Sequence, residues 1–189
     1  MTHPLYDALF RQHAGQATAF LHLADGRVLS HAEILGQAAQ FAHLLTDAGL
    51  VPGDRLAAQV HKSPQALALY AACVQAGVIF LPLNTAYTSD ELSYFIDDSG
   101  AKLVVCDGAD FDNVALITER VGAQLFSLNA DGTGTIAEAA QTKPGVFPTV
   151  SRTEDDLAAF LYTSGTTGRS KGAMLSQGNL LSNARTLAT

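Results

Sequence analysis

Short apolar runs alternate along the sequence with longer segments in which apolar residues recur at helical spacing. This alternation constrains the fold more than any other feature of the chain. The short runs, which are candidate strands, are residues 17–24, 55–61, 78–83, 102–107, 124–129 and 157–163. Strands that alternate with helices favour a parallel sheet whose faces are covered by those helices. We therefore predict an α/β fold with a mostly parallel sheet flanked by helices.

The segments between these runs carry helix start signals. Ser63 and Pro64 have the pattern of an N-cap followed by a first-turn proline. Thr88 and Glu91 have the spacing of a capping box. Further helices are predicted for residues 31–50, 111–121, 135–141 and 177–189, and a β-hairpin with an Asp-Gly turn is predicted for residues 21–30.

The chain is expected to contain an α/β unit over residues 1–150 and a second part over 151–189. Residues 143–151, with two prolines and a glycine, are the predicted connection. The helix predicted from Gln177 reaches the last residue without a C-cap glycine or a basic last turn. We therefore expect the chain to be a portion of a longer protein.

Composition excludes several classes of partner. The formal net charge is −7, so clustered cations for sequence-independent nucleic-acid binding are not expected. No apolar run reaches the roughly 18 residues of a membrane span. Cys73 and Cys106 lie singly in apolar runs and the six histidines lack ligand spacing, so we predict buried thiols and no metal site. The N-terminus does not have a secretory pattern, and the predicted location is the cytoplasm.

Residues 162–172, Tyr-Thr-Ser-Gly-Thr-Thr-Gly-Arg-Ser-Lys-Gly, are the strongest functional motif. Gly165 and Gly168 permit positive φ, so that successive backbone N–H groups can face one concavity. Hydroxyl donors and the Lys171 cation suit such a concavity to phosphate oxygens. The spacing of glycine and lysine differs from a Walker A loop, and the motif lies between two predicted strands. An exposed polar turn is the alternative interpretation. The predicted binding residues are Thr163, Ser164, Gly165, Thr166, Thr167, Gly168 and Lys171.

This motif resembles the phosphate-loop signature of the adenylate-forming enzymes, the superfamily of acyl-CoA synthetases, luciferases and peptide-synthetase adenylation domains. Residues 51–55, 76–84 and 91–102 resemble the N-terminal region of that family in the same order. Residues 81–88 and 155–162 are most similar to malonyl-CoA synthetases. Gln177 is a departure, because relatives often have histidine there.

The resemblance implies a two-step ligase. A carboxylate, with malonate as the expected acid, attacks the α-phosphate of ATP, and the thiol of coenzyme A then takes the acyl group from the adenylate. The loop would bind the β- and γ-phosphates and stabilise the departing pyrophosphate. Mg²⁺ would bridge the phosphates, with its carboxylate ligand beyond residue 189. No catalytic residue is expected within the chain, which alone should be inactive.

Three alternatives remain open at this stage. The first is a free-standing module that binds a nucleotide or pyrophosphate without catalysis. The second is a structural half that forms homo-oligomers through an uncovered sheet edge. The third is dinucleotide binding by residues 131–137, which match G-x-G-x-x-A but are not followed by the second strand and acidic residue that this fingerprint needs. The acidic clusters 97–98 and 154–156 are expected to cap or solvate the ends of elements.

Overall fold

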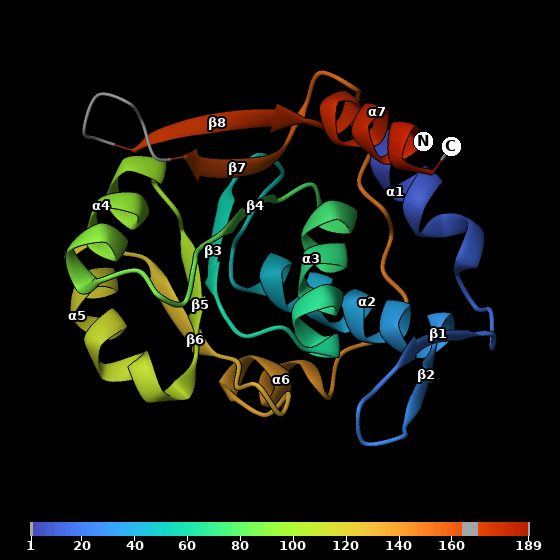
Figure 1. Cartoon of the computed structure of the whole chain (residues 1–189), viewed down its shortest axis with the longest axis horizontal. Coiled ribbons are helices and arrows are strands. Elements are labelled where there is room, and N and C mark those ends of the chain that lie inside the picture. Colours follow the sequence, from blue (N-terminus) through green and yellow to red (C-terminus); the bar gives the residue numbers. More distant parts are fainter. Residues whose placement is uncertain (1, 164–169, 189) are drawn as a thin grey trace.

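A six-stranded sheet organises the molecule (Figure 1). The computed structural model describes residues 2–163 and 170–188. The strand order is β6-β5-β3-β4-β7-β8, and every neighbouring pair is parallel except β7 and β8. The strands are β3 (Arg55–Gln59), β4 (Ile79–Pro82), β5 (Leu103–Cys106), β6 (Gln124–Ser127), β7 (Leu157–Thr163) and β8 (Lys171–Ser176). A separate antiparallel hairpin joins β1 (Ala19–His22) and β2 (Val28–Ser30). The predicted fold class is confirmed.

Helices cover both faces of this sheet. One face packs against α1 (Pro4–Leu9), α2 (His31–Asp47), α3 (Pro64–Ala76), α6 (Thr135–Ala140) and α7 (Gln177–Leu187). The other packs against α4 (Ser89–Ser99) and α5 (Phe111–Val121). Successive side chains of a strand point to opposite faces, so β3 sends Leu56 and Ala58 into the first core and Ala57 into the second. The central strand therefore joins two cores.

Side-chain caps begin the helices where the sequence predicts them. The Ser63 hydroxyl accepts a hydrogen bond from the Ala66 amide, and Pro64 occupies the first turn of α3. At α4, the Thr88 side chain accepts from the Glu91 amide while the Glu91 carboxylate accepts from the Thr88 amide. The predicted capping box is confirmed.

The elements differ from the prediction mainly at their ends. The strand predicted over residues 102–107 stops at Cys106, because the Asp107 carboxylate accepts from the Ala109 amide and turns the chain out of the sheet. Helix α1 was not predicted. It begins at Pro4, and the His3 ring serves as its N-cap.

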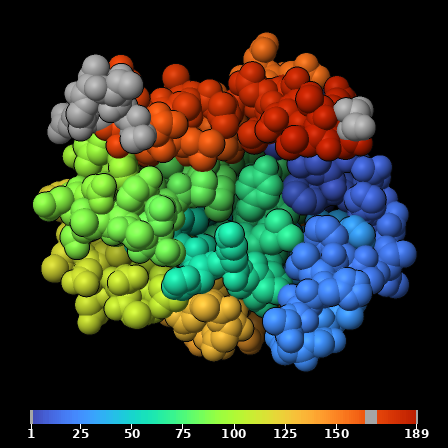
Figure 2. All heavy atoms as spheres, viewed as in Figure 1, coloured from blue at the N-terminus to red at the C-terminus, as the bar shows by residue number. Residues whose placement is uncertain are grey.

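The strands of the β7–β8 hairpin run at an angle to the other strands of the sheet. Its register with β4 is limited to Phe80 opposite Ala159, and Figure 1 shows it crossing one end of the sheet so that the turn end of β7 lies near α4. The space-filling view in Figure 2 has the hairpin directly above α4. The ends of β7 and β8 therefore meet the surface of this helix.

Candidate functional site

The two strands of the hairpin bring the ends of the predicted phosphate loop together. Thr163 is the last residue of β7, Lys171 is the first residue of β8, and the two are register partners. The Thr163 hydroxyl donates to the Lys171 carbonyl oxygen at 3.5 Å. Both residues are exposed. The Lys171 ammonium group is thus available to an anion at the base of the loop, and the Thr163 hydroxyl can donate to an anion only by giving up its bond to the Lys171 carbonyl oxygen.

The remaining predicted binding residues, Ser164, Gly165, Thr166, Thr167 and Gly168, lie outside the described residues, as does Arg169. Their role in phosphate binding stays a prediction. Thr163 and Lys171 are the two members of the predicted site for which the structure gives a position.

Helix α4 supplies a polar contact to each strand at the base of the loop. The Tyr94 hydroxyl donates to the Ser170 carbonyl oxygen at 3.2 Å. The Tyr162 hydroxyl donates to Asp98 Oδ2 at 2.6 Å. Asp98, which was expected with Asp97 to cap or solvate the end of an element, thus also makes a contact across to β7. Tyr94 and Asp98 are four residues apart and so share one face of α4, and this spacing is the signal that could have identified them.

Aromatic rings surround these two hydrogen bonds. The Tyr162 ring lies 4.3 Å from the Phe95 ring and 5.2 Å from the Phe160 ring, measured between centroids. The Phe160 ring also covers Gly172, where the Cβ of any other residue would collide with it. Glycine at this position lets the ring close over the start of β8.

The environment of Tyr162 keeps its hydroxyl protonated. Burial raises the pKa of Tyr162 well above its ordinary value, and the hydrogen bond to the Asp98 carboxylate acts in the same direction. The hydroxyl therefore remains a donor to Asp98 throughout the range in which the protein would work.

The G-x-G-x-x-A match forms a tight turn between β6 and α6. The Thr135 hydroxyl accepts from the Ser127 amide, and Gly134, with φ of 132°, lies so close to the Ser127 carbonyl oxygen that a Cβ would collide with it. The turn is thus packed against its own strand. Glycine at 134 serves this close approach.

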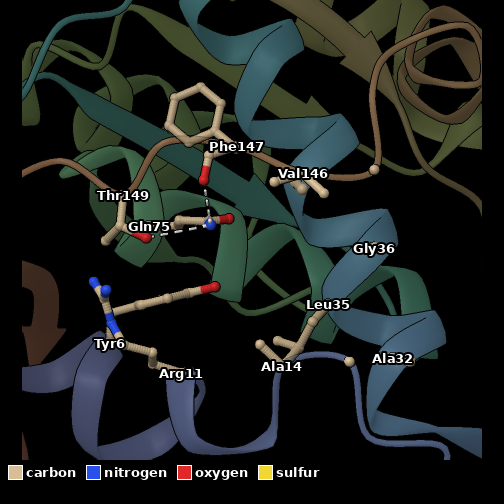
Figure 3. Close-up of a pocket in the computed structure, with 13 residues that line it drawn as sticks. Tyr6, Arg11, Ala14, Ala32, Leu35, Gly36, Gln75, Val146, Phe147 and Thr149 are labelled. Atoms are coloured by element: carbon tan, nitrogen blue, oxygen red, sulfur yellow. Dashed lines mark hydrogen bonds between the residues drawn. The ribbon is translucent and has the colours of Figure 1, made fainter.

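A cavity of about 330 Å³ lies on the other side of the molecule, among α1, α2, α3 and the segment that carries Phe147 (Figure 3). The Gln75 amide donates to the Phe147 carbonyl oxygen and to the Thr149 hydroxyl on its wall. Its cationic lining residue, Arg11, is paired with Asp7 at 2.6 Å. Because that charge is already compensated, the cavity is a weaker anion site than the hairpin base.

Within residues 2–163 and 170–188, no group of three or more His, Cys, Asp or Glu side chains could hold a metal ion. In the same ranges, no helix combines the length and apolar character that crossing a membrane requires.

Comparison with characterised sequences gives relatives that activate carboxylic acids. A feruloyl-CoA synthase from Amycolatopsis is 37% identical over 87% of this chain and 31% of its own length. An oxalate–CoA ligase from Arabidopsis thaliana is 32% identical over 77% of this chain and 29% of its own length. The chain thus spans about a third of the length of these relatives.

Solved structures agree with this comparison. MatB from Rhodopseudomonas palustris superimposes on the whole chain with a TM-score of 0.94 and 48% sequence identity, both in its apo form and with ATP bound. The chain covers 37% of MatB. Residues 8–189 match the family described as AMP-binding enzyme. The fold, the hairpin and these matches agree, and the chain belongs to the AMP-binding enzyme family.

Proposed function

We propose that the chain is the N-terminal portion of an ATP-dependent acyl-CoA synthetase, in which residues 163–171 bind the β- and γ-phosphates of ATP. The observation that carries this proposal is the 48% identity, over the whole chain, to a MatB structure with ATP bound. The intact Thr-Ser-Gly-Thr-Thr-Gly-Arg-Ser-Lys sequence of this loop supports it further.

The role proposed for the loop is electrostatic. When a carboxylate attacks the α-phosphate, negative charge accumulates on the departing pyrophosphate, and a lysine and hydroxyl donors fixed beside it lower the energy of that state. Lys171 supplies the cation, and because it is the register partner of Thr163, the two residues lie on the same face of the hairpin. Mg²⁺ would add charge neutralisation on the phosphates through ligands in the rest of the protein.

The proposed acid is malonate and the proposed acyl acceptor is coenzyme A. The similarity of residues 81–88 and 155–162 to malonyl-CoA synthetases supports this choice, as does the likeness to MatB. The pocket that selects the acid is proposed to lie in the remainder of the enzyme, since the chain spans about a third of its relatives. A cytoplasmic location belongs to the same proposal.

Calorimetric titration with inorganic pyrophosphate tests the role of the loop. Wild-type chain is expected to bind pyrophosphate, and Lys171→Ala is expected to weaken binding about tenfold or more, the loss for a charge-assisted contact to an anion. Lys143→Ala is the matched control. It removes the same charge from a lysine that pairs with Asp47 at 2.6 Å, away from the hairpin, and should leave the affinity unchanged.

Equal loss in the two lysine variants would show non-specific charge attraction and contradict the proposed loop. Two further measurements test the fragment. Strong binding of ATP by the 189-residue chain would favour a free-standing nucleotide-binding module. Formation of malonyl-CoA from malonate, ATP and coenzyme A by this chain alone would contradict the proposal that the remainder of the enzyme is required.

A further inference from the structure

Helix α4 contacts the polypeptide on both sides of residues 164–169. Ser170 immediately precedes Lys171, and Tyr162 immediately precedes Thr163. The Tyr94 hydroxyl donates to the Ser170 carbonyl oxygen just before the start of β8. The Asp98 carboxylate accepts from the Tyr162 hydroxyl near the end of β7. One face of α4 therefore contacts the residue before Lys171 and the residue before Thr163.

This helix is itself anchored at both ends. Its N-terminus is closed by the capping box of Thr88 and Glu91. At its C-terminus, the Arg55 guanidinium donates to the carbonyl oxygens of Ser99 and Gly100, each at 2.8 Å. Because Arg55 belongs to β3, α4 is tied to the central strand of the sheet. Contacts to α4 therefore relate the hairpin to a rigid part of the fold.

The charge of Asp98 is of the wrong sign for an anion-binding site. Its carboxylate accepts a hydrogen bond from the side chain of Tyr162, the residue next to Thr163, in the same part of the hairpin as the proposed pyrophosphate site. A negative charge at that place repels a polyanion. Attraction of the ligand therefore does not account for Asp98, whereas its hydrogen bond to Tyr162 does.

We propose that Tyr94 and Asp98 are positioning residues for Lys171 and Thr163, the pair at the end of the hairpin. Tyr94 fixes the Ser170 backbone and Asp98 fixes the Tyr162 side chain, so that Lys171 and Thr163 face the pyrophosphate group. This inference rests on the proposed function. It adds two residues outside the loop motif to the binding apparatus, and it gives the Asp98 carboxylate a role other than attraction of the ligand.

Pyrophosphate titrations of three variants test the inference. Tyr94→Phe removes the hydroxyl that contacts Ser170 and keeps the ring. Asp98→Ala removes both the acceptor and the negative charge, whereas Asp98→Asn removes the charge and keeps an acceptor oxygen for Tyr162. We expect about three- to tenfold weaker binding for Tyr94→Phe and Asp98→Ala, the loss for one hydrogen bond that orders a binding group. Asp98→Asn should bind as well as wild type or more tightly.

The two explanations of Asp98, electrostatic and positional, predict opposite changes in pyrophosphate affinity for Asp98→Ala. If only electrostatics matters, loss of the carboxylate strengthens pyrophosphate binding, and that result overturns the role of Asp98. If position matters, binding weakens and Asp98→Asn restores it. Urea unfolding of Asp98→Ala and Asp98→Asn measures any general loss of stability separately from the affinity. Unchanged affinity of Tyr94→Phe likewise removes Tyr94 from the proposal.

Tyr87→Phe is the matched control. The Tyr87 ring lies 4.8 Å from the Phe95 ring, so this variant loses a hydroxyl from the same aromatic group without changing the hydrogen bonds of Tyr94 and Asp98 at the hairpin base. Its affinity should equal that of wild type, and circular dichroism should give native spectra for all variants. Asp98→Ala is the variant most prone to misfold, and Tyr94→Phe then decides the test alone.

Failure of the inference can be told apart from failure of the proposed function. Absence of Lys171-dependent pyrophosphate binding in the wild-type chain would contradict the proposed loop and, with it, the inference. Lys171-dependent binding that is insensitive to Tyr94→Phe and Asp98→Ala would overturn the inference and leave the proposed function intact.

Discussion

His3 shows how one buried side chain makes the stability of this protein depend on pH. The residue is fully buried, and its Nδ1 accepts a hydrogen bond from the Tyr6 amide at the start of α1. This contact requires Nδ1 without a proton. Burial lowers the pKa of the His3 imidazole below its ordinary value of 6.5. As pH falls below that value, the unfolded chain binds the proton first, so the contribution of His3 to stability is complete above about pH 6.5 and is lost as pH falls toward the folded pKa.

We expect His3→Asn to reduce this pH dependence. Asparagine keeps an acceptor suited to an N-cap but does not titrate. Urea unfolding between pH 7 and pH 5 should show a free energy of unfolding that declines for wild type and changes less for the variant. At pH 7, His3→Ala should cost about 1 kcal/mol or more, because the cap is lost. An equal decline in wild type and His3→Asn would contradict the assignment, and His61→Asn, at an exposed histidine, is the control.

Residue-scale features that depend on near neighbours in sequence could be predicted. The Ser63 cap and the Thr88–Glu91 capping box are closed by hydrogen bonds within three residues, so their pattern is visible in the chain itself. The His3 cap was missed because histidine is not a usual N-cap residue. The contact of Asp98 with Tyr162 could not be predicted because the two residues are 64 positions apart.

At the scale of elements, the hairpin of β7 and β8 depends on the close approach of the Phe160 ring to the backbone of Gly172. The sequence predicts a strand on each side of the phosphate motif, and both are present. The crossing over α4 could not be predicted, because it depends on packing of Tyr162 against Phe95, which lies far away in sequence. Phe160 packs in turn against Tyr162.

Gly172→Ala should therefore destabilise the hairpin by about 1–2 kcal/mol, the typical cost of forcing a methyl group into a filled space. The new Cβ would collide with the Phe160 ring. Phe160→Leu makes room, so the double variant should lose less stability than the sum of the two single variants, as measured by urea unfolding. Strict additivity would show that the ring does not limit position 172. Gly178→Ala, also in a described segment near the end of β8, is a comparison variant with neighbours at 3.2 Å and beyond.

On the scale of the whole molecule, the sheet separates two cores that share β3. Each core contains one cysteine. Cys73 of α3 is fully buried in the larger core, and Cys106 of β5 is fully buried on the side of α4 and α5. Burial raises the pKa of the Cys106 thiol to about 12, with the Asp110 and Asp107 carboxylates acting in the same direction, and burial also raises the pKa of Cys73. Both thiols are therefore protonated and inaccessible in the native state.

The two thiols should be unreactive toward a disulfide reagent at pH 8 in the native protein and should become reactive together in urea. Because β3 packs into both cores, loss of one core removes support from the other. Mass spectrometry of the labelled peptides measures each cysteine separately along the same denaturant series. Separate midpoints for Cys73 and Cys106 would contradict a single cooperative unit.

The overall class of the fold could be predicted because it depends on the rhythm of strands and helices. The strand order could not, because it is set by pairings such as Phe80 with Ala159, which no local pattern encodes. The same holds for α1, whose six residues are too few to show a helical period in the sequence.

The position of α1 has a consequence for how this polypeptide is completed during synthesis. Leu5 and Tyr6 of α1 belong to the same core as Leu181 of α7, and Figures 1 and 2 show the two helices side by side. A nascent chain can place α1 on α3 early, but α7 is translated only after the whole of the six-stranded sheet. The contact between α1 and α7 therefore forms only after the sheet that lies between them in sequence has been made.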